Sequence, residues 1–565
     1  MTRPPSGRGL KALIFFTTFT AYSAVGYWLQ VQQGFILGDA LSRVSAAQSV
    51  LFSRDPHLAA IGFIFTPLSA LLQIPAIALG QLWPYITERA FSGSLMSAVF
   101  MAGAAVQIFS MGTDRGLARP YALAITLLFA VNPMILFYGS NGMSEAPFIF
   151  FISWAVRRLI LWMRDDDVHH LVTAGGIAMG LAYLTRYDAL ACIAAAGALV
   201  GTTTYLRARP APRARRAILD LLMVSGPGVV AFLGWATISW LITGEAFAQF
   251  TSQYGNTAIL AQSGQTRPTF GHGLEFAATC IMLLAPALIP IGLCAVSRRW
   301  RHPSWTAILP PVAIYGAALG FQSLSYAMGS TFPFLRFYIV AIPFTACLAM
   351  LAVPDQTGAA VKRRGKYAPA PPQPDLAARR SSAAVPVAVA AVFAMSIPVT
   401  VWGMGQPKYA PQEYALGAVL SPRPDDVSDR AATELSIAAT FSTEREIAHH
   451  LDELALPEGS VIVDTEYGFA IVAASHRPKA FVVPSDLDFV TDLNKPAQNG
   501  IKYLLAVPPV GRGAVDALNL RYPTLYDTGA DIATLELEIP NNGDNQPNWR
   551  LYRVNQAASE VEGFS

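Results

Sequence analysis

Asp39 is the residue of this chain best placed for acid–base chemistry. It follows Leu37-Gly38, just beyond the first long apolar stretch, and begins a helical run over 39–52. An ionisable residue at the edge of a membrane is costly unless it is paired or functional. Aspartate is also a preferred helix N-cap. The sequence therefore leaves a capping role and a general-base role open, and the two roles are compatible.

Three arginines could hold an anion near that carboxylate. Arg43 lies one helical turn after Asp39, where it could pair with the carboxylate or fork onto a phosphate. Arg186 lies in a short hairpin between two apolar runs, on the predicted outer side, and Arg336 opens a later apolar run. Because basic residues are normally kept inside, the outer position of Arg186 favours binding to an anion or an acidic partner.

Other polar residues on the same predicted side extend the candidate site. Asp55-Pro56-His57 forms either a simple turn or a second polar wall, and Glu145 starts a span that Asn141 or Ser144 could cap. The loop 244–271 carries amides and aromatic rings of the kind that bind sugars. The candidate binding residues are Arg43, Asp55, His57, Glu145, Arg186, Tyr187, Asp188, Tyr254 and Arg336.

Several common kinds of site are missing from the sequence. There is no glycine-rich phosphate loop, no Cys/His spacing typical of a metal site and no nucleophile elbow. The pairs His169-His170 and His449-His450 are adjacent, and adjacent positions on a helix point apart. No metal ligand and no cofactor are predicted, and dependence on a divalent metal stays open.

The composition indicates a membrane protein. The chain has 565 residues, of which 53% are hydrophobic and only 14% charged, and its formal net charge of +3 gives no reason to expect nucleic acid. The four cysteines lie in apolar stretches and are expected to be buried thiols. Eleven spans are expected near 11–30, 90–110, 119–138, 143–163, 171–185, 187–206, 218–243, 273–297, 304–328, 334–353 and 384–404.

The basic residues predict the orientation of these spans. Eleven spans place every arginine-rich cluster on one side, which is the cytoplasmic side. The clusters are Arg3 to Lys11, Arg115 with Arg119, Arg157 to Arg164, Arg207–Arg216, Arg298–Arg301, and Lys362–Lys366 with Arg379–Arg380. The N-terminus is then inside, and the proline-containing stretch 62–85 is expected as a helix lying in the outer interface.

The chain divides into four parts. Residues 1–353 form a transmembrane module, 354–383 a cytoplasmic linker rich in Pro, Ala and Arg, 384–404 the last span, and 405–565 an outer domain. Thr443 and Glu446 form a capping-box pattern before a helix at 447–456. Strands are expected at 460–463, 480–483, 502–507, 534–539 and 549–554, which together with helices predict a small α/β domain.

This arrangement resembles the GT-C glycosyltransferases, especially the branch that contains protein O-mannosyltransferases and lipid A aminoarabinose transferases. The likeness covers about residues 10–353. It lies in one span followed by Gly38-Asp39, a second interfacial helix, Arg89 before the next span, Ser144-Glu145, Arg186 in a hairpin, and Arg336 before a later span.

The resemblance implies an inverting glycosyltransferase of the bacterial inner membrane. Its donor would be a polyprenyl-phosphate sugar, and its acceptor a hydroxyl on a cell-envelope glycan, lipid or protein. Asp39 would be the general base, while Arg186 and Arg336 would hold the donor phosphate. Ala40 stands where these families often have a second acidic residue, so mannosyl, arabinofuranosyl and other pentosyl transfer all stay open.

Two other functions are compatible with the sequence. A transporter or flippase of lipid-linked sugar would have charges at mid-membrane and broken helices in matching halves, whereas the charges here gather at the outer rim. A non-catalytic scaffold for envelope assembly would leave Asp39 as a helix cap only.

Overall fold

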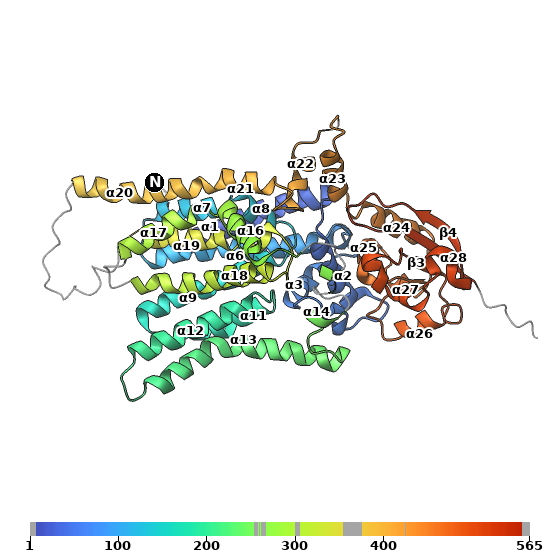
Figure 1. The fold of residues 1–565 in the computed structure, drawn as a ribbon, viewed down its shortest axis with the longest axis horizontal. Helices are drawn as coiled ribbons and strands as arrows, with labels where there is room; N and C mark the ends of the chain where they lie inside the picture. Colours follow the sequence, from blue (N-terminus) through green and yellow to red (C-terminus); the bar gives the residue numbers. More distant parts are fainter. Residues whose placement is uncertain are drawn as a thin grey trace, which may run out of the picture.

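The computed structural model describes residues 7–252, 258, 260–261, 267–299, 305–353, 376–423 and 425–555. It is a long bundle of helices with a smaller α/β domain at one end (Figure 1). Among the described residues, eight helices are long and apolar enough to cross a membrane. The pair α16–α17, bent by 79°, makes nine if it counts as one span. The chain is therefore a multi-pass helical membrane protein, as predicted.

The bundle contains most of the helices. They are α1 (Gly7–Gly26) with its π-helical continuation η1 (Tyr27–Gln32), α6 (Phe91–Asp114), α7 (Arg119–Ala130), α8 (Pro133–Tyr138), α9 (Glu145–Asp165), α10 (Val168–Leu171), η3 (Val172–Met179), α11 (Gly180–Tyr183), α12 (Ala189–Arg207), α13 (Arg213–Thr243), α16 (Phe270–Leu284), α17 (Leu288–Arg299), α18 (Leu309–Ala327), α19 (Ala341–Ala352), α20 (Leu376–Ala394) and α21 (Ser396–Met404). Two expected spans, 119–138 and 171–185, fall on interrupted helices, each of which is too short to cross a membrane by itself.

The segment between α1 and α6, residues 33–90, is called the first loop here. It contains α2 (Gly38–Phe52), η2 (Leu58–Ile61), α3 (Leu68–Leu71), α4 (Ile74–Ile77) and α5 (Tyr85–Glu88). Leu68–Ile77 forms a short apolar helical stretch, inside the interval expected for a second interfacial helix. Gly26 fixes how α1 enters this loop, because a Cβ there would lie 1.7 Å from Ser94 Oγ on α6. Only glycine allows the two helices to approach so closely.

The C-terminal domain is built on a five-stranded mixed sheet in the order β2-β1-β3-β5-β4. Strands β1 (Val461–Ile462), β2 (Phe481–Val482) and β3 (Tyr503–Ala506) are parallel, whereas β5 (Trp549–Val554) runs antiparallel to both β3 and β4 (Ala533–Ile539). All five strands lie in or within one residue of the predicted intervals. The helices of this region are α22 (Leu416–Leu420), α23 (Asp429–Ala438), α24 (Ser442–Glu453), α25 (Thr465–Ala474), α26 (Phe489–Asn494), α27 (Ala517–Arg521) and α28 (Leu525–Thr528).

The first loop lies between the bundle and this domain (Figure 1). Helix α25 packs against α2 and α5. The apolar contact joins Leu41 and Val44 of α2 to Phe441, Ala470 and Ala473, all buried. The loop and the domain therefore share one apolar core, which fixes α2 from the domain side.

One local prediction is wrong. Helix α24 begins at Ser442, so Thr443 lies inside it, and its hydroxyl accepts a bond from the main chain of Asn542 instead of capping the helix. Helix α20 begins at Leu376, inside the expected linker 354–383, and the apolar window that could span the membrane is Ala384–Met404. Residues 354–375 of that linker lie outside the described residues.

Candidate functional site

Asp39 is in the first turn of α2 but does not cap it. The N-cap position is Leu37, with an extended backbone and no side-chain bond to the helix. A carboxylate in the first turn still benefits from the positive end of the helix dipole. The Asp39 carboxylate instead lies 3.2 Å from Nη2 of Arg336, and its side chain is 42% exposed. The capping interpretation is therefore wrong, and the Asp39 side chain is partly open to solvent.

Four charged side chains beside Asp39 contact one another in sequence, and together with Asp39 they are called the Asp39 cluster. Arg336 lies between two carboxylates, with its Nε 3.9 Å from Oε1 of Glu145. The same Glu145 oxygen accepts a bond of 2.7 Å from Nη1 of Arg186. Arg186 in turn bonds Asp188 at 2.9 Å. Residues from the first loop, α9, the turn before α12 and the turn before α19 thus meet at one place.

Buried amide and aromatic groups hold the Asp39 cluster in position. Gln322 on α18 donates to Asp188 at 2.7 Å, which fixes the carboxylate that orients Arg186. The hydroxyl of Tyr187 donates to the carbonyl of Ile64 in the first loop. Tyr187 and Asp188 therefore act on the cluster by fixing the hairpin and the first loop.

Arg43 has a different environment from the other two arginines. Its Nη1 donates to the main-chain carbonyl of Asp39 at 2.7 Å, and its guanidinium lies 4.2 Å from the ring centre of Phe65. In the part of the chain that the structure describes, Arg43 makes no ion pair with a carboxylate. Of the three arginines, it has the most capacity left for an anionic ligand.

The structure adds residues that the sequence did not single out. Gln412 accepts a bond of 2.9 Å from Arg336, and Glu413 accepts one of 2.5 Å from Tyr138. Burial raises the pKa of Glu413 in spite of Tyr138 and Arg336. These residues follow the last span, far along the chain from Arg336, so no spacing pattern could have linked them to it.

The charges of the cluster keep Asp39 ionised. The protein packed around its carboxylate raises its pKa, even though part of the side chain is exposed. The guanidinium groups of Arg336, Arg43 and Arg186 outweigh this effect, so the pKa of Asp39 falls below its ordinary value. Arg512 of the C-terminal domain also lowers it.

Comparison with solved structures identifies the fold. ArnT from Cupriavidus metallidurans, bound to undecaprenyl phosphate, superposes with a TM-score of 0.54 at 15% identity, covering 98% of this chain and 99% of that one. The chain shares the fold of ArnT. The apo form of ArnT gives a TM-score of 0.52 at 14% identity, covering 97% and 98%.

The likeness to other solved structures is weaker. The archaeal oligosaccharyltransferase AglB from Archaeoglobus fulgidus, in complex with an inhibitory peptide and a dolichol-phosphate, gives a TM-score of 0.42 at 13% identity, covering 98% of this chain and 75% of that one. No protein-family model and no curated protein matches the sequence. The predicted resemblance to the aminoarabinose transferases is thus confirmed as a likeness to ArnT in fold, and this likeness covers 98% of the chain.

Some predicted site residues lie elsewhere. Asp55 accepts a bond of 3.3 Å from the main chain of Leu487 in the C-terminal domain, and the His57 ring bonds the Asp55 carbonyl. This places both residues in the turn after α2 and supports the turn interpretation over a second polar wall. Tyr254 lies outside the described residues.

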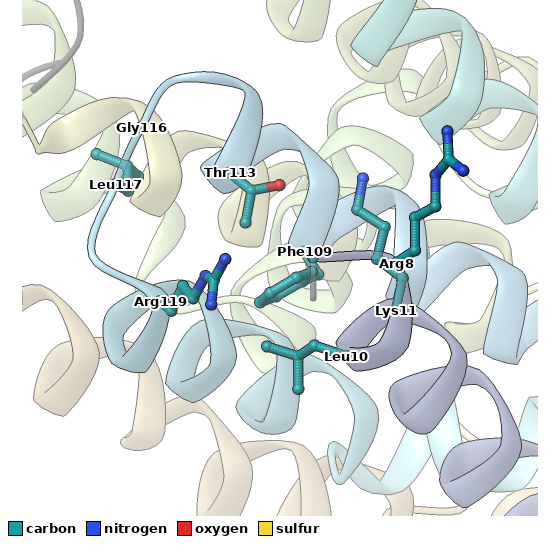
Figure 2. A pocket seen from close by; sticks show the side chains of 9 residues that line it. Arg8, Leu10, Lys11, Phe109, Thr113, Gly116, Leu117 and Arg119 are labelled. Carbon is teal, nitrogen blue, oxygen red and sulfur yellow. The ribbon is translucent and has the colours of Figure 1, made fainter. Parts of the chain in front are cut away.

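A cavity of about 720 Å³ lies far from this cluster, at the N-terminal end of α1 (Figure 2). Arg8, Lys11 and Arg119 line it, together with Thr113 and Phe109, and its described lining contains no carboxylate. The cavity is at the end of the bundle away from the C-terminal domain (Figure 1). The cavity lacks a proton acceptor of the kind that Asp39 offers. The Asp39 cluster is therefore the better candidate site for acid–base chemistry.

Proposed function

We propose that the protein is a membrane glycosyltransferase that moves a sugar from a polyprenyl phosphate to an acceptor hydroxyl. The observation that carries the proposal is an ionised Asp39, partly exposed and surrounded by Arg43, Arg186 and Arg336, in a chain that shares the fold of ArnT throughout. ArnT was solved with undecaprenyl phosphate bound, which supports the same class of lipid here.

The reaction follows from the roles of these groups. The acceptor oxygen attacks the anomeric carbon while its proton passes to the Asp39 carboxylate. The bond between the anomeric carbon and the phosphate oxygen breaks, and the electron pair leaves with the polyprenyl phosphate. Attack opposite to the leaving group inverts the anomeric centre. Because a carboxylate with a lowered pKa is a weak base, it accepts the proton only as the new bond forms and the hydroxyl becomes more acidic.

The arginines have separate tasks in this proposal. Arg43 is the primary contact for the donor phosphate, since it has no carboxylate partner among the described residues. Arg186 and Arg336 add positive charge, and Glu145 holds both in place. Preformed cations stabilise a leaving phosphate without having to reorganise during the reaction. The second oxygen of Glu145, Oε2, is buried without a hydrogen-bond partner in the described part of the chain, and it suits a sugar hydroxyl.

The proposed reaction is tested with the purified full-length protein in lipid nanodiscs. Polyprenyl phosphates carrying a radiolabelled hexose or pentose are offered with extracted envelope glycans, lipids or proteins. We expect transfer from at least one lipid donor, none from a nucleotide sugar, and an inverted configuration in the product. If the protein instead moves the intact lipid across a vesicle membrane without releasing polyprenyl phosphate, it is a flippase. If it does neither, the scaffold alternative gains support.

A further inference from the structure

Glu88, His449 and His476 bring three metal-ligating side chains together where the C-terminal domain meets the first loop. Glu88 ends α5, His449 lies on α24, and His476 follows α25. The Nε2 atom of His449 is 3.8 Å from Oε1 of Glu88, and the Nε2 atom of His476 is 4.0 Å from Oε2. All three ligand atoms lie within 4.8 Å of one another.

We propose that this cluster binds a zinc ion. Two imidazole nitrogens and one carboxylate oxygen are ligands that Zn²⁺ prefers, and a site with three protein ligands leaves a fourth position for water. Bonds of about 2.0–2.1 Å place tetrahedral ligand atoms about 3.3 Å apart. The two separations from Glu88 are less than an ångström longer than this, and all three ligand atoms lie within 4.8 Å of one another, so rotations of the side chains would close the site.

The exposure of the three residues allows that closure. The side chains of His449 and His476 are 47% and 54% exposed, whereas that of Glu88 is 6% exposed. The two imidazoles can therefore rotate toward a carboxylate that the packing holds still. Water can also reach the open position from the side of the imidazoles.

Ion pairs alone do not account for the arrangement. Separations of 3.8 and 4.0 Å are too long for hydrogen bonds between the imidazoles and the carboxylate. The Oε1 atom of Glu88 already has the Nε atom of Arg89 at 3.2 Å, yet two further imidazole nitrogens face the same group. Because Arg89 competes for the carboxylate, we expect micromolar affinity for zinc and not the tighter binding of structural zinc sites.

The position of the site gives it a structural consequence. One ligand comes from the first loop and two come from the domain, so a bound ion would join the two parts. Helix α25, which precedes His476, also packs against α2, the helix that carries Asp39. A bound ion would thus stiffen the seating of the domain over α2 without touching the reacting groups. The inference holds whatever group the protein transfers.

Zinc binding is measured directly on the full-length protein. The protein is purified with a histidine-free tag, stripped with a chelator and titrated with Zn²⁺ by calorimetry. We expect one ion per chain, and at least tenfold weaker binding in Glu88→Gln, His449→Ala and His476→Ala. His450→Ala is the matched control, since it removes the adjacent histidine of the same helix, and it should bind as the native protein does. Zinc should also raise the Tm of the native protein by a few degrees and leave that of a His449→Ala/His476→Ala variant unchanged.

Two results would overturn the proposal. One is the absence of stoichiometric zinc binding by native protein that melts cooperatively. The other is equal zinc affinity in native protein and in the His449→Ala/His476→Ala variant, which would place the ion elsewhere. The Tm measured without zinc shows whether each variant is folded, so that lost binding is not confused with lost structure.

Discussion

At the scale of single residues, Asp39 is accessible and lies beside several positively charged arginines. Its side chain is 42% exposed, while that of Arg336 beside it is only 6% exposed. The arginines keep the carboxylate ionised at neutral pH, but they also weaken it as a base. We infer that proton transfer waits until donor phosphate draws part of this positive charge away from Asp39.

Replacing Arg336 with glutamine should change the pH dependence of the reaction. Without this cation, the effect of burial on Asp39 is opposed by fewer charges and its pKa rises. A base with a higher pKa is protonated at a higher pH, so the acid limb of kcat/KM should move upward. The measurement is the pH–rate profile between about pH 4 and pH 8. Arg423→Gln, which removes an exposed arginine outside the cluster, should leave the profile unchanged; an unmoved limb in Arg336→Gln would argue against Asp39 as the base.

At the scale of elements, the C-terminal domain presents Arg512 toward the cluster. Arg512 binds Glu466 and lies 4.6 Å from the ring centre of Tyr467, and its charge acts on Asp39. The short helix that carries it, η8 (Gly511–Val515), follows β3 and contacts α25. This placement suits a contact with the acceptor, which approaches Asp39 from the domain side in our proposal.

Arg512→Ala should therefore weaken binding of the acceptor more than binding of the donor. We expect the KM for the acceptor to rise at least about fivefold, with the KM for the lipid donor nearly unchanged, because a single charged contact contributes about 1 kcal/mol or more. Arg521→Ala is the matched control, since Arg521 lies over Tyr522 in the same way. Steady-state kinetics with each substrate varied in turn separate the two effects, and a donor-only effect would reverse the assignment.

A second prediction concerns Arg54, which follows α2, and the aspartates in and just before α26. Arg54 pairs with Asp486, Asp488 and Asp492. Burial, with smaller contributions from Asp488 and Asp55, raises the pKa of Asp486 from its usual 3.8 to about 6, although the main chain of Val483 and Arg54 lower it. A pKa raised by folding gives stability that is complete below pH 3.8 and is lost as the pH rises through about 6.

The free energy of unfolding should therefore fall by up to about 3 kcal/mol across this pH window. Asp486→Asn keeps an acceptor for the main chain of Val483 but removes the titrating group, so Tm should depend less on pH. Thermal melts followed by intrinsic fluorescence test this in the full chain, with the exposed Asp531→Asn as control. An equally steep dependence in Asp486→Asn would show that another group is responsible.

At the scale of the whole molecule, the bundle, the first loop and the domain form one continuous assembly, in which α2, the helix that carries Asp39, lies between the bundle and the domain (Figure 1). Our expectation is that this end of the molecule faces outward and the cavity lined by Arg8 and Arg119 faces the cytoplasm. The arginine clusters support that orientation. A lipid-linked donor would then meet its acceptor at the outer surface.

The orientation can be measured by labelling single cysteines in intact cells. Val510→Cys lies on the domain and is 69% exposed, and a membrane-impermeant maleimide should label it. Arg209→Cys lies in the turn between α12 and α13 and should react only after lysis. The native cysteines among the described residues are buried or half-buried, so their background is low. The opposite labelling pattern would invert the proposed orientation.

The sequence predicts the strands and the long spans well because both depend on local apolar patterns. The sequence also predicts that Asp39, Glu145, Arg186 and Arg336 lie on the same, outer side of the membrane, since charges at the ends of spans are rare and costly. It misses Gln412, Glu413 and the cluster of Glu88 with His449 and His476. Those contacts join residues far apart in the chain, and their positions depend on how the domain packs onto the first loop.

The most direct test of the account is the rate of sugar transfer by Asp39→Asn with donor already bound. In single-turnover experiments at saturating acceptor, we expect the rate to fall at least about 100-fold, because an amide cannot accept the proton. Binding of the lipid donor and the Tm should stay close to those of the native protein. Asp55→Asn, a carboxylate of the same segment that contacts Leu487 instead, should keep full activity. Native transfer rates in Asp39→Asn would contradict the account.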